Sequence, residues 1–110
     1  MSEAITKTVL LLGRRDVVIE EVKRQLDLPG VQLIGGTGLE DVRKAFTQTR
    51  IDHVIMGAGI DLETRLEIIR EIFQSSDATT VHMKDRVTGP QGFLPFIAAV
   101  LAGLDNYPVV

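Results

Sequence analysis

The sequence predicts a single three-layer α/β domain with a four-stranded, mostly parallel sheet and helices on both faces. Apolar runs alternate four times with amphipathic segments, and the connections between them are short. Such strict alternation is typical of parallel sheets built with right-handed crossovers. With 110 residues, the chain is long enough for one hydrophobic core and too short for a second domain.

The first strand is expected at residues 8–12, where TVLLL forms a continuous apolar run that ends at Gly13. A run of this kind indicates a strand that is buried on both faces. Asp16 is expected to cap the helix that follows. The apolar positions of that helix recur at helical spacing, at Val18, Ile19, Val22 and Leu26.

The second strand is expected at residues 31–34, VQLI, and its polar Gln32 favours an edge position. The stretch GGTGLEDV that comes next is interpreted as a turn feeding a helix. Thr37 and Glu40 have the spacing of a capping box. The predicted buried stripe of this helix consists of Leu39, Val42 and Phe46.

The third strand is expected at residues 53–56, HVIM, and closes on Gly57, Ala58 and Gly59. Asp61 is then placed to cap a long helix. The inner side of this helix is predicted to carry Leu62, Leu66, Ile69, Ile72 and Phe73.

The fourth strand is expected at residues 79–84, where Thr80, His82 and Lys84 alternate with Val81 and Met83. Period two indicates one face that is wet or reserved for a partner. The last helix is expected to begin near Pro95 and is apolar nearly all round, so it is either deeply buried or part of an interface. Its apolar stretch falls short of the ~20 residues that a membrane helix needs.

Burial predicts the order of the strands. The first and third strands are the most apolar and should be central, which gives the order 2-1-3-4 of a flavodoxin-like sheet. Residues 1–7 are expected to form a flexible N-terminus and residues 105–110 a C-terminal tail.

Composition excludes several classes of function. The chain is 45% hydrophobic and 25% charged, with a net charge of -3 and no block of basic residues, so no nucleic-acid partner is expected. Zero cysteines exclude disulfides, thiolate nucleophiles and cysteine-zinc sites, and agree with a cytoplasmic location. No metal or cofactor is expected.

The run VLLLGRRD, the segment HVIMGAGID and the order of the elements resemble the receiver domain of bacterial response regulators. In that family an aspartate at the end of the third strand is phosphorylated, and the matching residue here is Gly57. The acidic pair that holds Mg²⁺ matches Gly13 and Arg14, and the family's Ser or Thr aligns near Lys84. The resemblance also implies that the family's fifth strand and fifth helix are absent. The resemblance therefore implies a truncated pseudo-receiver that is not phosphorylated by the family mechanism.

Loss of a fifth unit would leave the fourth strand as an open edge and one face of the sheet thinly covered. Bare parallel sheet is seldom left exposed, so a partner is expected there, most simply a second copy in a homodimer. The expected contacts are Val81 and Met83 of the fourth strand with Phe93, Phe96, Ile97, Val100 and Leu101 of the last helix.

Ligands of open α/β sheets bind beyond the carboxyl ends of the strands, where the strand order reverses. The candidate anion-binding residues there are Gly13, Arg14, Arg15, Gly57, Ala58, Gly59 and Lys84. The same glycines could simply close turns, with the two arginines solvated or paired to Asp16 or Asp61. His53 and His82 lie inside strands without metal-ligand spacing, and are expected to be satisfied or interfacial.

Two functions stay open at this point. The preferred one is a non-catalytic regulatory or protein-interaction module that is homodimeric or docks on another protein. The alternative is a protein that binds a small phosphate or nucleotide ligand, or an enzyme that uses such an anion site.

Overall fold

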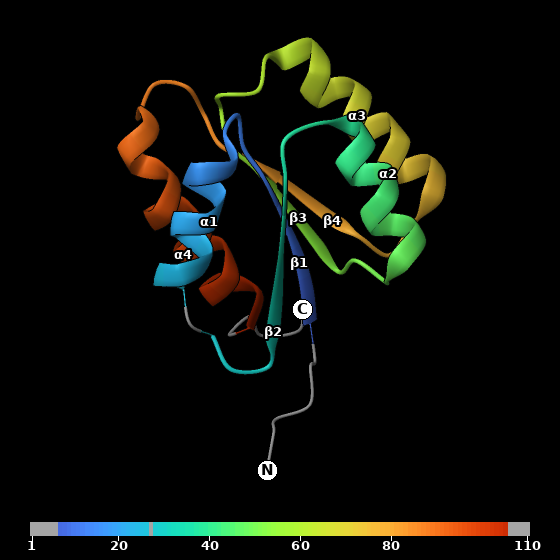
Figure 1. The fold of residues 1–110 in the computed structure, drawn as a ribbon, viewed down its shortest axis with the longest axis horizontal. Helices are drawn as coiled ribbons and strands as arrows, with labels where there is room; N and C mark the ends of the chain where they lie inside the picture. Colours follow the sequence, from blue (N-terminus) through green and yellow to red (C-terminus); the bar gives the residue numbers. More distant parts are fainter. Residues whose placement is uncertain (1–6, 27, 106–110) are drawn as a thin grey trace.

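The computed structural model describes residues 7–26 and 28–105, which form one four-stranded parallel sheet in the order β2-β1-β3-β4 (Figure 1). The strands are β1 (Lys7–Leu12), β2 (Val31–Gly36), β3 (His53–Met56) and β4 (Thr80–Met83). The predicted strand order and the central positions of the first and third strands are confirmed. The protein has the three-layer α/β architecture of flavodoxin-like folds.

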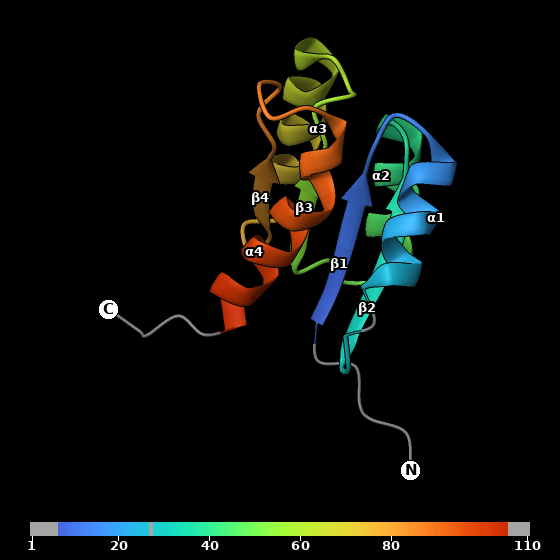
Figure 2. The same cartoon turned by 90° about the vertical axis from the view of Figure 1, so that its left-hand side faces the viewer.

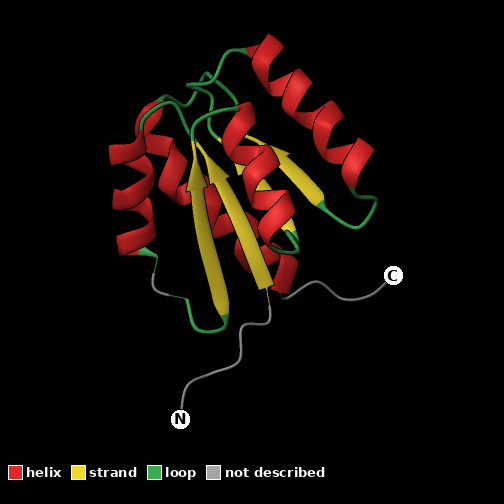
Figure 3. Cartoon of the chain, turned by 45° about the vertical axis from the view of Figure 1, so that its right-hand side comes forward, coloured by secondary structure: helices red, strands yellow, loops and turns green. Residues whose placement is uncertain are grey.

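Four helices cover the two faces of the sheet in pairs (Figures 1 and 2). They are α1 (Asp16–Gln25), α2 (Leu39–Gln48), α3 (Leu62–Ser75) and α4 (Phe93–Asp105), and a short 3-10 turn, η1 (Pro90–Gly92), precedes α4. The pair α1 and α4 packs on one face, and the pair α2 and α3 packs on the other. Figure 3 shows the strands enclosed between the two helical layers.

This pairing corrects the expectation of a thinly covered face, because α4 packs beside α1 and supplies the missing cover. Phe93, Ile97 and Leu101 lie one helical turn apart and are all buried against Val9, Leu11 and Ile55 of the sheet, among others. These three α4 residues were predicted to contact a partner. They have almost no accessible surface left for one, because they fill the core of their own chain.

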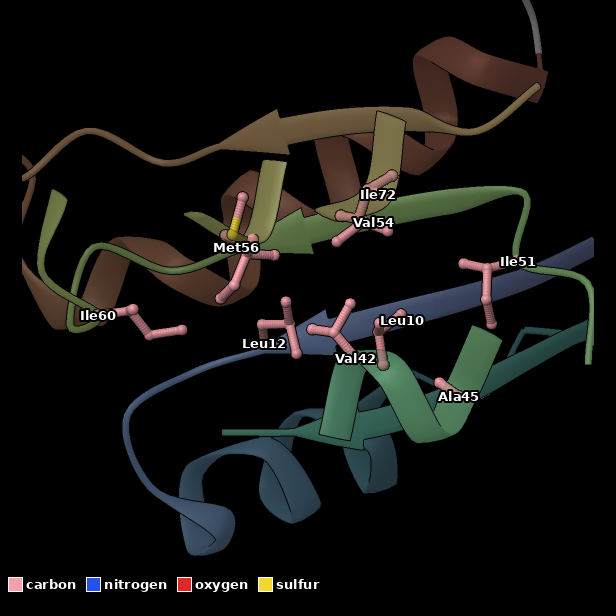
Figure 4. Packing of buried hydrophobic residues seen from close by; sticks show 10 residues of the cluster. Leu10, Leu12, Val42, Ala45, Ile51, Val54, Met56, Ile60 and Ile72 are labelled. Carbon is pink, nitrogen blue, oxygen red and sulfur yellow. The ribbon is translucent and has the colours of Figure 1, made fainter. Parts of the chain in front are cut away.

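The second core cluster lies between the sheet and the α2 and α3 pair. Figure 4 shows Val42 and Ala45 of α2 beside Leu10 and Leu12 of β1. The central strands β1 and β3 therefore bury alternate residues in two different clusters, as their continuous apolar runs predict. The predicted stripe of α2 is confirmed for Val42, and Leu39 and Phe46 pack at its margin.

Of the three N-terminal helix caps predicted from the sequence, one is present in the structure. Asp61 caps α3, accepting hydrogen bonds from Thr64 Oγ1 at 2.6 Å and Thr64 N at 3.3 Å, and the first of these is the main cause of its lowered pKa. Asp16 is the first residue of α1 and not its cap. The capping box is also wrong: Gly38 precedes α2, and the Asp41 carboxylate accepts from Thr37 N at 2.8 Å.

Several boundaries differ from the prediction by one or two residues. Lys7 already belongs to β1, since its backbone N–H donates to Gly30 O at 3.2 Å. β2 continues through Gly36, β4 is shorter at both ends than expected, and α4 starts two residues before Pro95. α4 also includes Asp105, so the remaining predicted terminal segments, 1–6 and 106–110, lie outside the described residues. No helix in the described part of the chain is long and apolar enough to cross a membrane.

Gly35 in β2 permits the close approach of α1 to the sheet. A Cβ at this position would lie 2.3 Å from Ile19 Cγ2 and 3.6 Å from Ile19 Cβ. Because Ile19 is β-branched and buried, its side chain has little freedom to move away. Gly103 in α4 is the opposite case, since nothing lies within 4 Å of a Cβ built there.

We therefore expect the same substitution to have opposite effects at these two glycines. Gly35→Ala should lower the free energy of unfolding by about 1–3 kcal/mol through overpacking. Gly103→Ala should raise it by about 0.5–1 kcal/mol, because alanine loses less backbone entropy in a helix. Urea denaturation of both variants measures the two changes, and equal effects would contradict the proposed contact of α1 with β2.

Candidate functional site

The loops at the carboxyl ends of β1 and β3, residues 13–15 and 57–59, meet as the topology predicts. A Cβ on Gly59 would lie 3.0 Å from Arg14 Cβ, so the two loops touch at this point. A Cβ on Gly57 would lie 3.3 Å from Cε1 of Phe93, and one on Gly13 would lie 3.8 Å from Cε2 of the same ring. The Phe93 ring therefore packs over both strand ends.

This packing gives the glycines of the rim a structural role. Gly13 is also close to Ile19, whose Cδ1 would lie 2.8 Å from a Cβ there. A larger residue at Gly13 would press against Ile19, and one at Gly57 would press against Phe93; both side chains belong to the core between α1, α4 and the sheet. Close approach of helix side chains to the strand ends therefore accounts for glycine at these two positions.

Lys84 follows β4 at the same edge of the sheet, but its side chain is turned into the protein. It is 3% exposed, and Nζ donates to Asp85 O at 3.0 Å and Thr88 Oγ1 at 2.7 Å. Asp85 Oδ1 lies 3.8 Å from Nζ and accepts a hydrogen bond from Thr88 Oγ1 at 2.7 Å. The ammonium group thus holds the loop between β4 and η1, instead of facing a ligand.

Arg14 and Arg15 are exposed members of the predicted anion site, as is Gly59. Arg15 is the residue before α1, and Ala58 is half-buried between the two rim glycines. Neither guanidinium group forms an ion pair or hydrogen bond with any residue that the structure describes, so of the two predicted alternatives the solvated one holds, and pairing with Asp16 or Asp61 is not found. Among the seven predicted residues, the two arginines are therefore the exposed cations, while the third cation, Lys84, is buried.

Arg65 of α3 is a buried cation that the sequence interpretation missed. It is 6% exposed, and Nη1 donates to Lys84 O at 3.1 Å, which ties α3 to the end of β4. Its Nε has no hydrogen-bond partner among the described residues. The signal for its position was its spacing, because Arg65, Ile68 and Ile72 share one helical face.

His53 and His82 are linked through one hydroxyl group. Thr80 Oγ1 lies 2.6 Å from His53 Nδ1 and 2.9 Å from His82 Nε2, and the two rings meet edge to face at 6.4 Å. The hydroxyl has one proton and two lone pairs, so it can donate to at most one of the two imidazoles. Thr80 thus joins the two histidines between β3 and β4, and no group of three metal-ligating side chains occurs in the described ranges.

The outer side of α3 carries the most apolar surface of this helix. We call Leu62, Leu66, Ile69 and Phe73 the α3 flank. Leu62 is 55% exposed, Leu66 52% and Phe73 54%, while Ile69 is partly buried. These four residues were predicted, together with Ile72, to form the inner side of α3. The prediction is correct for the buried Ile72 and in part for Ile69, which packs against the edge of the core, and it is wrong for the other three.

The position of the α3 flank in the fold follows from the neighbours of α3. The ion pair between Arg43 Nε and Glu71 Oε1, at 2.8 Å, marks the side that faces α2. At about 100° per residue, the α3 flank lies on the other side of the buried stripe, toward the β4 edge. Val81 packs against the same core cluster as Ile69, and Met83 is 39% exposed on this edge. The predicted contacts Val81 and Met83 therefore border the α3 flank.

We expect phosphate to bind no specific site at the rim. Millimolar phosphate should change the melting temperature of the wild type and of an Arg14→Ala/Arg15→Ala variant equally, because only the general exclusion of phosphate from protein surface acts on both. Differential scanning fluorimetry measures both shifts. A rise in the wild type that the variant lacks would favour the anion-binding alternative.

His82 should make the stability of the protein depend on pH. Burial lowers the pKa of His82 below its ordinary 6.5, so the unfolded chain takes up a proton at higher pH than the folded chain does. This contribution to stability is complete above pH 6.5 and is lost progressively as the pH falls below it toward the folded pKa. The difference in unfolding free energy between wild type and His82→Gln should therefore shrink on acidification. A difference that does not vary with pH would contradict the assignment.

Comparison of the chain with protein-family models, with curated proteins and with solved structures returns no match. The resemblance to receiver domains therefore stays a prediction, while the flavodoxin-like architecture is a property of the structure itself.

Proposed function

We propose that this protein is a non-catalytic, cytoplasmic interaction module that docks on a protein partner through the α3 flank and the adjoining β4 edge. The observation that carries the proposal is the orientation of α3. Three large apolar side chains, Leu62, Leu66 and Phe73, are each more than half exposed, while an arginine on the same helix is buried. A contiguous exposed apolar surface of this kind is typical of a protein-protein contact.

Docking would bury the exposed apolar side chains of the α3 flank, and this burial supplies free energy of binding. Completing the burial of a leucine or phenylalanine side chain that is half exposed recovers roughly half of the 1.5–3 kcal/mol that full burial provides. Three such residues on the α3 flank supply a hydrophobic centre for an interface. A standard interface covers about 800 Å² on each partner, which is more than one short helix offers, so the β4 edge is expected to contribute.

The geometry of the rim supports a non-catalytic role. Gly13 follows β1 and Gly57 follows β3, and neither position supplies an oxygen ligand from its side chain. Lys84, the buried cation at the rim, already donates to Asp85 and Thr88. These features agree with a pseudo-receiver-like protein that is not phosphorylated by the receiver mechanism, and they favour docking over anion binding.

Site-specific photo-crosslinking tests the proposal in the cells that naturally make the protein. A benzophenone amino acid is placed at Leu66 in the α3 flank, and in a control at Val17, which is 71% exposed on α1. Irradiation should give one defined protein adduct from position 66 and none from position 17. Mass spectrometry identifies the adduct, and a Phe73→Ser substitution should reduce its yield because it removes part of the hydrophobic centre.

Two crosslinking results would contradict the proposed function. If position 66 gives no adduct, or the same adducts as position 17, the α3 flank is ordinary solvent-exposed surface and the proposed function is wrong. Circular dichroism of the Phe73→Ser variant serves as the folding control, since a side chain that is 54% exposed contributes little to the core.

A further inference from the structure

We infer that the partner of the α3 flank is a second copy of this chain, held by two antiparallel α3 helices across a twofold axis. This inference rests on the proposed function, because it names the occupant of the same surface. Its basis is that the pattern of apolar and charged residues on α3 is complementary to itself when the helix is reversed.

The apolar positions of the α3 flank are symmetric along the helix. Leu62, Leu66, Ile69 and Phe73 are separated by four, three and four residues, so the spacing is the same in both directions. In an antiparallel pair, Leu62 of one copy meets Phe73 of the other, and Leu66 meets Ile69. Spacings of three and four residues place all of these side chains in one seam between two helices.

The charges beside the seam are complementary under the same reversal. Glu63 follows Leu62, and Arg70 follows Ile69, so both lie on the same outer side of the α3 flank, seven residues apart. A twofold axis brings Glu63 of each copy beside Arg70 of the other, and the pair occurs twice. Both side chains are exposed, and neither has a hydrogen bond or ion pair within the part of the chain that the structure describes.

A parallel pair of α3 helices would not bring Glu63 and Arg70 of the two copies together. It would bring the outer side of one helix against the inner side of the other, where Arg65 and Ile72 are buried in their own chain. Antiparallel pairing leaves those inner residues on the sheet side. There the same twofold axis sets the two open β4 edges antiparallel to each other, with Met83 of each copy near the interface.

The size of the contact sets the expected affinity. The 14 residues of α3 span roughly 21 Å at 1.5 Å per residue, and only four positions form the seam. An interface of this extent belongs to the small end of specific contacts. We therefore expect a reversible dimer whose population rises with concentration, not a permanent one.

Charge reversal tests the pairing. Glu63→Arg gives a copy with two basic residues beside the seam, and Arg70→Glu gives one with two acidic residues, so each variant alone should dimerise about tenfold more weakly than the wild type. A mixture of the two variants should recover association as a heterodimer, because each basic residue then faces an acidic one. Glu67→Arg is the matched control, with the same charge change on the same helix but off the seam, and it should dimerise like the wild type.

The measurement is solution mass by light scattering coupled to gel filtration, over a roughly hundredfold range of loading concentration. Native mass spectrometry distinguishes the heterodimer if one variant carries a mass tag. A wild type that stays monomeric, or a mixture that associates no better than the single variants, would overturn the inference. A Leu66→Asp variant should be monomeric, and its circular dichroism spectrum shows that it is folded.

The crosslink from position 66 separates failure of this inference from failure of the proposed function. An adduct with a second copy supports both. An adduct with a different protein supports the proposed function and overturns the homodimer. An internal crosslink to residues 1–6 or 106–110 overturns both, because this chain itself would then occupy the surface. No adduct at all overturns both.

Discussion

The packing of the Phe93 ring over the ends of β1 and β3 is the contact on which the arrangement of the helices depends. It favours a small residue at Gly57, where a Cβ would lie only 3.3 Å from the ring, and it starts α4 on the same face of the sheet as α1. With α4 in that place, two helices cover each face, and four strands suffice for a closed three-layer core. The glycines that suggest a ligand loop in the sequence are thus explained by helix packing.

A second consequence concerns the last strand. Because α4 returns over the sheet to the face of α1, nothing in the described chain pairs with the outer edge of β4 or covers the outer side of α3. Lys84 stabilises this arrangement from inside, since its ammonium group holds the loop that turns the chain from β4 toward α4. The open side of the molecule therefore lies at α3 and β4. The open edge of β4 was predicted from the sequence, whereas the thinly covered sheet face predicted with it is not found.

Sequence patterns predicted the fold well, because they report burial along the chain. The continuous apolar runs at β1 and β3 identified the central strands, and the alternation in β4 identified an edge. The candidate surface was not predicted, because it depends on which way a helix is turned. In α3, two stripes have helical spacing, and hydrophobicity alone selects Leu62, Leu66 and Phe73 for the core over the stripe that contains Arg65.

The structure buries the less apolar stripe of α3. The ion pair of Arg43 with Glu71 lies on the side of α3 that faces α2, and Asp61 caps the start of the helix. In this orientation Ile68 and Ile72 face the sheet, and Arg65 faces the end of β4, where Lys84 O accepts one of its hydrogen bonds. Burying an arginine while leaving two leucines and a phenylalanine exposed costs stability in the isolated chain. That cost is offset if the exposed stripe is buried by another molecule, which is the physical reason to regard the α3 flank as the functional surface of this protein.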